Sequence, residues 1–341
     1  MLAALERGST APWHAALLLR RRLAHPVAIR ASSGASSAAD TVSPMDAAVR
    51  NVGIGERLRT VLEMIKFEHT LFALPFAFLG MLLAAEGLPR WRTIGWIVVA
   101  MVGARSAAMG FNRLVDRRID ARNPRTVTRA LPAGQLTPAF VAAFVAVSAA
   151  VLVLAAWQLN PLAFALSPVA LLVLFLYSFT KRFTALCHLV LGLALAGAPL
   201  GAWIAVRGEV AAAAVTLAGA VLLWVAGFDV LYALQDVDVD RRQGLFSIPA
   251  RLGVERALWV SALFHAGTLT LLALLPRLYS PGLGAAYWIG VAGCAALLAW
   301  QHWVVRPGDL SRLNAAFFTA NGVLAVWLFA ATAVDVIALR G

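Results

Sequence analysis

Two short acidic motifs carry the residues of this 341-residue chain that are most able to do chemistry. The first contains Asn112, Asp116 and Asp120, and the second contains Asp236 and Asp240, so Asp116 and Asp240 lie 124 positions apart, each followed by two arginines. Oxygen ligands at this spacing suit magnesium, which takes one or two carboxylates per ion and is usually completed by waters and substrate phosphates. The pattern predicts two facing sites that hold Mg²⁺ and a diphosphate.

Each motif continues toward the amino terminus as a polar stripe. Residues 4, 7 or 11 positions apart share one face of a helix. One stripe therefore holds Arg105, Asn112 and Asp116, and the other holds Asp229, Tyr232, Asp236 and Asp240. Arg105 and Asp229 lie within apolar segments, where an isolated charge costs at least ~2.5–3.5 kcal/mol. Such charges face a polar cavity or one another, and the sequence leaves both interpretations open.

The elements that position these motifs are transmembrane helices. The chain is 61% hydrophobic and 13% charged, with a mean hydropathy of +0.79, which is typical of membrane proteins. Segments of about 20 apolar residues span a bilayer as helices. Such segments lie at 64–86, 93–111, 138–158, 160–179, 186–206, 211–233, 257–276, 283–304 and 313–338. We expect an all-α polytopic membrane protein with nine transmembrane helices, arranged as two four-helix pseudo-repeats plus a ninth helix around a central cavity.

The formal net charge of +12 follows membrane topology. Among the loops between these segments, those after the even-numbered segments hold most of the lysines and arginines, and the opposite loops hold only Arg90, Arg92, Arg207 and Arg277. The positive-inside rule then places both acidic sites on the cytoplasmic side of a bacterial membrane, or on the matrix side of a mitochondrial inner membrane. The charge pattern predicts no nucleic-acid partner, and no protein partner is inferred.

Residues 1–45 differ in composition from the rest of the chain. They are rich in arginine, serine and alanine, with only Glu6 and Asp40 as acids. This composition is typical of an organellar targeting peptide, but a disordered or non-native extension upstream of Met45 fits it equally well. We expect the functional domain to comprise residues 46–341.

Four motifs in order resemble the intramembrane aromatic prenyltransferases of the UbiA superfamily. These are the Asn112–Asp120 motif, the stretch Asn123–Gly134, the segment Tyr177–Thr184, and the Asp236–Asp240 motif. The resemblance runs from about residue 56 to the carboxyl end. Two departures are Arg113, where many members carry aspartate, and Ala130, which replaces a common proline. The stretch Gly227–Gly253 is most similar to the bacterial 4-hydroxybenzoate-like branch, which includes members linked to futalosine-route menaquinone synthesis.

The resemblance implies transfer of a polyprenyl chain from an allylic polyprenyl diphosphate to an aromatic hydroxy acid within the lipid bilayer, in ubiquinone or menaquinone biosynthesis. The expected acceptor is 4-hydroxybenzoate, with 1,4-dihydroxy-6-naphthoate as the alternative. The implied metal ligands for Mg²⁺ are Asn112, Asp116, Asp120, Asp236 and Asp240, and the implied diphosphate ligands are Arg125, Arg129, Lys181 and Arg182. Asp229 would contact the acceptor hydroxyl, Arg105 its carboxylate, and Tyr232 would position the substrate.

A membrane transporter is the alternative from another class of protein. Nine spans, a parallel repeat and paired intramembrane charges also fit a carrier. A carrier binds its substrate near the middle of the membrane, whereas both acidic motifs here follow the end of an apolar segment. The position of the motifs therefore favours an enzyme.

Overall fold

The computed structural model describes residues 53–65, 70–306, 308, 310, 312–313 and 316–338. All of them belong to one compact unit, Pro44–Gly341. The predicted extension at residues 1–45 lies outside the described residues.

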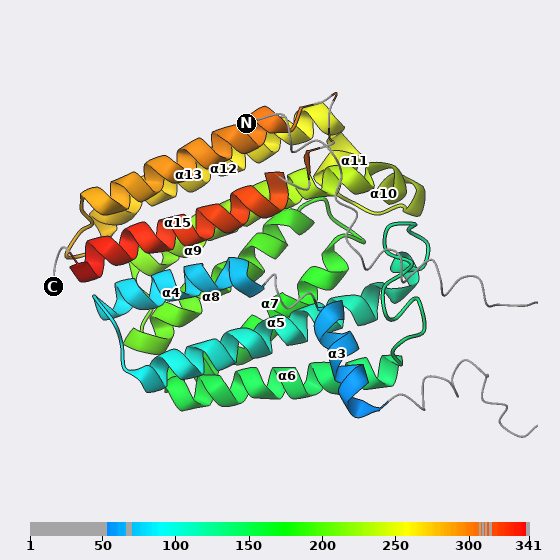
Figure 1. Ribbon diagram of the computed structural model, residues 1–341, viewed down its shortest axis with the longest axis horizontal. Helices are drawn as coiled ribbons and strands as arrows, with labels where there is room; N and C mark the ends of the chain where they lie inside the picture. Colours follow the sequence, from blue (N-terminus) through cyan, green and yellow to red (C-terminus); the bar gives the residue numbers. More distant parts are fainter. Residues whose placement is uncertain are drawn as a thin grey trace, which may run out of the picture. The chain divides into compact units, whose positions relative to one another are not determined.

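The described residues form helices and no strands (Figure 1). The α-helices are α3 (Ile54–Met64), α4 (Thr70–Ala85), α5 (Trp91–Asp120), α6 (Pro138–Leu159), α7 (Pro161–Thr180), α8 (Cys187–Arg207), α9 (Ala212–Ala233), α10 (Val237–Gln243), α11 (Ile248–Leu252), α12 (Val254–Leu278), α13 (Ala285–Val304) and α15 (Asn321–Ala333). A 3-10 turn, Leu234–Asp236, joins α9 to α10, and π-helical turns, Ala316–Ala320 and Val334–Ala338, flank α15. The predicted all-α class is confirmed.

Seven helical segments in the described part of the chain are long and apolar enough to cross a membrane, which is typical of an integral membrane protein. They are Trp91–Asp120, Pro138–Leu159, Pro161–Thr180, Cys187–Arg207, Ala212–Gln243, Val254–Leu278 and Phe317–Ala338. All nine predicted segments coincide with helices, but the predicted count of nine spans is not confirmed in that form. The helix α4 has only 16 residues, and α13 ends in polar residues that include Gln301 and His302.

The helices repeat with the same offset as the acidic motifs. A shift of 124 positions places α5 on α9 and α10, α6 on α12, α7 on α13, and α8 on α15. The packing repeats too, because α5 packs against α6 as α9 packs against α12. This correspondence brings the two acidic motifs to the same end of the bundle, where Figure 1 shows α10 and α11.

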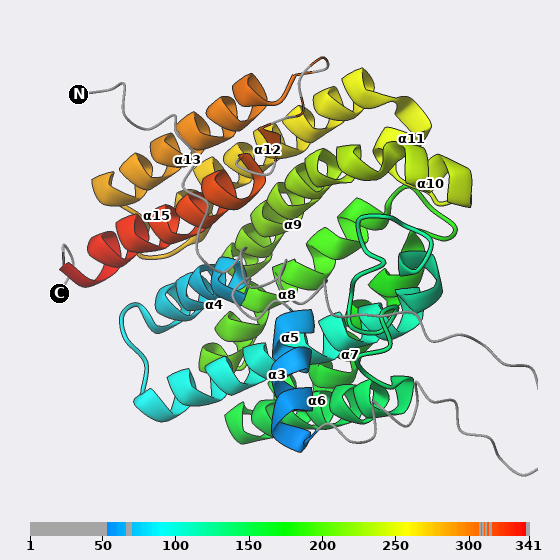
Figure 2. The same cartoon turned by 45° about the vertical axis from the view of Figure 1, so that its right-hand side comes forward.

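The central helix of the bundle is α9, which lies between α8 and α12 in Figure 2. In the most apolar stretch of the segment Ala212–Gln243, 67% of the residues are buried, compared with 11% in the corresponding stretch of α7. The helices α8 and α9 approach closely because Gly192 has no side chain, and a Cβ there would overlap the carbonyl oxygen of Leu222. Close packing of α9 holds the second acidic motif in a fixed position.

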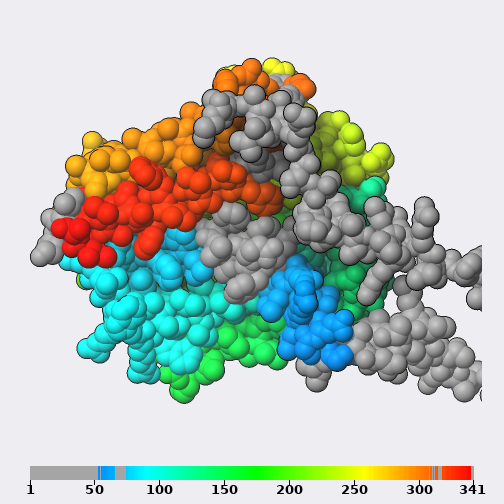
Figure 3. Space-filling model, viewed as in Figure 1, coloured from blue at the N-terminus to red at the C-terminus, as the bar shows by residue number. Residues whose placement is uncertain are grey.

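Helix α3 packs across α6 and the loop of residues 121–137. Val61 and Met64 of α3 belong to an apolar cluster with Leu136 of the loop and Val141 of α6. In Figure 3, α3 lies at the surface beside α6. The helix therefore helps to hold this loop over the end of the bundle.

Substitution of Gly192 by alanine tests the α8–α9 contact. We expect Gly192→Ala to destabilise the protein by about 1–3 kcal/mol, because the added methyl group pushes the two backbones apart. Thermal unfolding in detergent measures the change. Gly197→Ala in the same helix is the matched control, since a Cβ at Gly197 meets no atom within 4 Å. Equal melting temperatures for the two variants would contradict this packing.

Candidate functional site

A cavity of about 740 Å³ lies at the end of the bundle that carries the acidic motifs. Helices α5, α7, α8 and α9 and the loop of residues 121–137 contribute to its walls. The structure brings together along this cavity all twelve residues that the sequence singled out: Arg105, Asn112, Asp116, Asp120, Arg125, Arg129, Lys181, Arg182, Asp229, Tyr232, Asp236 and Asp240. For Arg105, Asn112 and Asp116 of α5, this agrees with the helical face that the spacing predicted.

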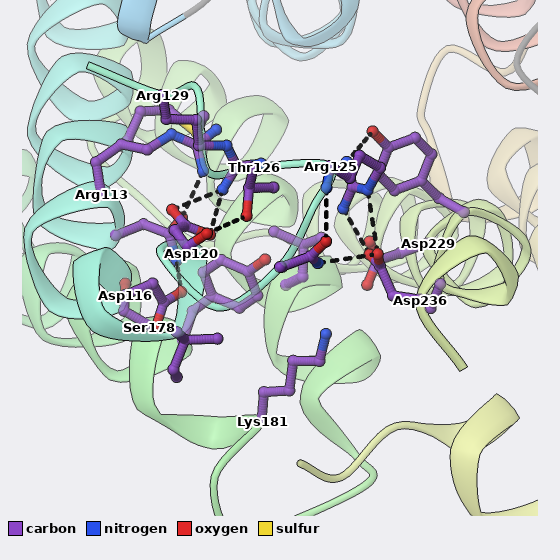
Figure 4. Close-up of a pocket in the computed structure, with 18 of the residues that line it drawn as sticks. Arg113, Asp116, Asp120, Arg125, Thr126, Arg129, Ser178, Lys181, Asp229 and Asp236 are labelled. Carbon is purple, nitrogen blue, oxygen red and sulfur yellow. Dashed lines mark hydrogen bonds and ion pairs between the residues drawn. The ribbon is translucent and has the colours of Figure 1, made fainter. Parts of the chain in front are cut away.

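The first acidic motif lies at the end of α5, where both aspartates have cationic partners. Figure 4 shows the contact of Asp120 with Arg129. Asn112 Nδ2 donates to Asp116 Oδ2 at 2.9 Å, and Arg182 donates to Asp116 Oδ1 at 3.0 Å. Arg129 Nη1 donates to both oxygens of Asp120, at 2.7 and 2.8 Å. Two loops thus supply the cations that neutralise this motif.

The second motif is neutralised in the same way. Arg125 donates to both oxygens of Asp236, at 3.1 Å from Nε and 2.5 Å from Nη2, and its Nη1 donates to the Tyr232 hydroxyl at 3.2 Å. Lys181 Nζ lies 2.7 Å from Asp240 Oδ1, and Ser247 Oγ donates to Asp240 Oδ2 at 2.9 Å. Lys181 and Arg182 are neighbours in sequence, so a single loop joins the two motifs.

The two loop cations at the second motif keep their positive charge. Burial alone would lower the pKa of Lys181. The electrostatic attraction to Asp240 and the hydrogen bond with it have a larger, opposite effect, so the pKa is raised above its ordinary value. Burial likewise opposes the charge of Arg125, and its hydrogen bond and attraction to Asp236 reverse that effect and raise the pKa. Both side chains therefore present cations to the cavity at neutral pH.

The ligands that the two motifs offer are an amide oxygen and four carboxylates. Within the ranges that the structure describes, no group of three His, Cys, Asp or Glu side chains is arranged to hold a metal ion. Each of the four carboxylates instead forms a salt bridge with a cationic side chain. Hard oxygen ligands without sulfur or imidazole fit Mg²⁺ better than zinc or copper. The chemistry of this donor set therefore fits a magnesium site completed by an anionic ligand.

A second group of polar residues lies further along the same helices. Asp229 Oδ2 is 2.6 Å from His188 Nδ1, so the hydrogen-bond partner of Asp229 is His188 and not Arg105. The Nε of Arg105 is buried and has no hydrogen-bond partner among the described residues. Phe228 and Phe317 line the cavity beside this group. The arrangement leaves an unpartnered guanidinium nitrogen and a carboxylate next to an aromatic-lined space.

Three polar residues at the site were missed by the sequence reasoning. Asn123 donates to Asp236, Ser247 donates to Asp240, and His188 pairs with Asp229. Asn123 and Ser247 lie in loops, where no periodic pattern marks a residue that faces inward. The only signal for His188 was its polarity at the start of an apolar helix.

The two motifs differ in backbone conformation. Helix α5 continues through Asp120, whereas a 3-10 turn ends at Asp236 and α10 begins at the next residue. The prediction of one continuous helical face from Asp229 to Asp240 is therefore wrong in detail, although both residues line the cavity. Asp238, between Asp236 and Asp240 in sequence, is exposed and does not line the cavity.

Comparison with known proteins identifies the fold. The chain has a TM-score of 0.70 and 33% identity with the apo structure of a UbiA homolog from Aeropyrum pernix K1, covering 77% of this chain and 96% of that one. A UbiA homolog from Archaeoglobus fulgidus, solved with GPP and Mg²⁺, has a TM-score of 0.62 at 17% identity, covering 81% of this chain and 100% of that one. At that identity the second likeness shows the fold alone.

Sequence relatives agree with the structural neighbours. The chain is 33% identical to a 4-hydroxybenzoate octaprenyltransferase of Tolumonas auensis, over 71% of this chain and 83% of that protein. It is 35% identical to the protein of the same name from Aeromonas salmonicida, over 70% and 82%. The profile of the UbiA prenyltransferase family matches residues 73–330, which favours the enzyme over the transporter. The chain therefore belongs to the UbiA prenyltransferase family and is a membrane-embedded prenyltransferase.

Proposed function

We propose that this chain transfers a polyprenyl group from an allylic polyprenyl diphosphate to 4-hydroxybenzoate, as a step of quinone biosynthesis. The observation that carries the proposal is one cavity with four acid–base pairs at its polar end and Arg105 with Asp229 deeper in the bundle. The polar end suits a metal-bound diphosphate, and the deeper pair suits an aromatic hydroxy acid. The curated relatives named 4-hydroxybenzoate octaprenyltransferase support this choice of acceptor.

When the donor binds, the four salt bridges between carboxylates and basic side chains open, and each side chain takes a new partner. Asn112, Asp116, Asp120, Asp236 and Asp240 would hold Mg²⁺, and Arg125, Arg129, Lys181 and Arg182 would turn from the carboxylates to the phosphate oxygens. These four basic side chains are 27–39% exposed along the cavity, so they can reach a bound anion. Bound Mg²⁺ offsets the negative charge that develops on the diphosphate as the carbon–oxygen bond breaks.

The deeper residues orient the acceptor. Arg105 forms a charge-assisted hydrogen bond with the aromatic carboxylate. Asp229 accepts a hydrogen bond from the ring hydroxyl, which raises the electron density at the ortho carbon. Tyr232 lines the cavity on α9, between Asp229 and Asp236 in sequence, and its ring helps to position the substrate. The ring thus presents its ortho carbon to the allylic carbon of the donor.

The reaction then balances without any group beyond the two substrates. The allylic carbon–oxygen bond breaks and its electrons leave with the diphosphate. A new carbon–carbon bond forms at the ortho carbon, which then loses its hydrogen as a proton so that the ring regains aromaticity. One diphosphate and one proton are released for each prenylated product. The cationic side chains that line the cavity stabilise the departing diphosphate electrostatically.

Purified protein in detergent tests the function directly. Incubation with Mg²⁺, a polyprenyl diphosphate and 4-hydroxybenzoate is expected to release diphosphate and yield an ortho-prenylated acid, with no product when EDTA replaces Mg²⁺. A parallel reaction with 1,4-dihydroxy-6-naphthoate measures the alternative acceptor. If only the naphthoate is prenylated, the acceptor is the naphthoate and not 4-hydroxybenzoate. If neither compound is prenylated, the proposed function is wrong.

Asp240 provides a test of the donor site with a matched control in the same helix. We expect Asp240→Asn to lower kcat at least about 100-fold, because it removes one carboxylate of the proposed metal site. Asp238→Asn changes the same residue type two positions away, on the exposed side of α10, and should leave kcat unchanged. Steady-state kinetics of both variants, with thermal unfolding to verify folding, measures the difference. Equal kcat values for Asp240→Asn and Asp238→Asn would show that Asp240 is not part of the metal site.

Arg105 provides a test of the acceptor site. We expect Arg105→Met to raise the KM for 4-hydroxybenzoate about 10- to 100-fold, the loss expected for one hydrogen bond to a charged group. The KM for the diphosphate should not change. The methyl ester of the acceptor lacks the carboxylate, so the parent and the variant should use it equally poorly. If the substitution changes the KM for the acid and for the ester by the same factor, Arg105 does not bind the carboxylate.

A further inference from the structure

His188, the second residue of α8, is a buried histidine with a partner on each ring nitrogen. Its Nδ1 lies 2.6 Å from Asp229 Oδ2, and its Nε2 lies 3.2 Å from the backbone nitrogen of Ile248. His188 is 2% exposed, whereas 22% of the Asp229 side chain is exposed along the cavity. Both residues border the cavity, and Asp229 presents the larger accessible surface of the two.

The partner of Nε2 determines the protonation of the ring. The backbone N–H of Ile248 can only donate, so Nε2 must accept and carries no proton. A neutral imidazole has a single N–H, which is then at Nδ1 and donates to Asp229 Oδ2. An imidazolium would place an N–H at Nε2 facing the N–H of Ile248. The hydrogen bonds therefore require a neutral ring that carries its proton on Nδ1 and donates it to Asp229 Oδ2.

The N–H of Ile248 is itself held in place. Ile248 is the first residue of α11, where a backbone N–H has no acceptor within the helix and needs one from elsewhere. The two preceding residues are tied to the donor site, because Phe246 N donates to Lys181 O at 2.7 Å and Ser247 Oγ donates to Asp240 at 2.9 Å. Segment 246–248 therefore links the polar end of the cavity to His188.

We propose that His188 is a positioning residue whose neutral, Nδ1-protonated ring keeps Asp229 ionised and turned toward the acceptor. The carboxylate oxygen that His188 does not engage is then free to accept a hydrogen bond from the ring hydroxyl. His188 takes up no proton during the reaction and touches neither substrate. This role rests on the proposed function of Asp229 toward a hydroxylated aromatic acceptor.

Two substitutions of His188 separate this role from proton transfer. His188→Leu keeps a similar volume but cannot donate to Asp229. It should lower kcat on the order of 10- to 100-fold, as for other residues that orient a functional group by a hydrogen bond, and leave the KM for the diphosphate unchanged. His188→Gln offers an amide N–H to Asp229 and a carbonyl oxygen to Ile248, but it cannot carry a proton between groups. It should recover most of the activity lost in His188→Leu.

A spectroscopic measurement tests the tautomer without turnover. In protein labelled with ¹⁵N-histidine at neutral pH, the signals of His188 are those that disappear in His188→Gln. We expect one protonated nitrogen, Nδ1, and one unprotonated nitrogen, Nε2. An imidazolium pattern, or a proton on Nε2, would overturn the assignment even if His188→Leu does not fold.

The kinetic outcomes are equally decisive. If the folded His188→Gln protein is as slow as His188→Leu, the imidazole itself is required and the positioning role is wrong. Full activity of His188→Leu would show that Asp229 does not depend on His188. Failure of the proposed function would be recognised separately, because the parent protein would then prenylate neither acceptor while the ¹⁵N spectrum could still show the Nδ1-protonated ring.

Discussion

The pairing of four carboxylates with four cationic side chains at one end of a membrane-embedded bundle is the interaction on which this site depends. An unpaired charge in such surroundings carries a desolvation cost of several kcal/mol, and a close partner offsets much of it. Asp240 is only 2% exposed, and Lys181 together with Ser247 occupies both of its oxygens. The cationic side chains come from loops. The salt bridges that offset the desolvation cost of the carboxylates therefore also hold these loops over the cavity.

These pairs join the two pseudo-repeats. Arg125 follows the first motif in sequence but binds Asp236 of the second, across 111 positions, while Lys181 and Arg182 reach one motif each. The exchange of partners in our proposal would use this arrangement, since Mg²⁺ would take the carboxylates and the phosphates would take the freed cations. The two repeats also differ in their loops. The first provides the arginines, and the second provides segment 246–248, which contacts both Asp240 and His188.

Helical periodicity explains why much of the site could be predicted from the sequence. Spacings of 4, 7 and 11 place Arg105 with Asn112 and Asp116 on one face whatever the rest of the fold, and the repeated motif indicated which helices meet. The partners of the acids could not be predicted, because they depend on the path of loops such as residues 121–137. His188 was missed because a single polar residue in an apolar helix has no periodic pattern. The predicted span count is not confirmed exactly, because α4 is short and α13 ends in polar residues.

In the proposed mechanism, the four salt bridges open when a metal-bound diphosphate enters the cavity. A structure of the protein with Mg²⁺ and an unreactive thio-diphosphate analogue of the donor would reveal this exchange. We expect carboxylates of both motifs to coordinate the metal, and Arg125 and Lys181 to contact phosphate oxygens instead of Asp236 and Asp240. A bound analogue that leaves the Arg125–Asp236 and Lys181–Asp240 pairs intact, with no metal between the motifs, would contradict it.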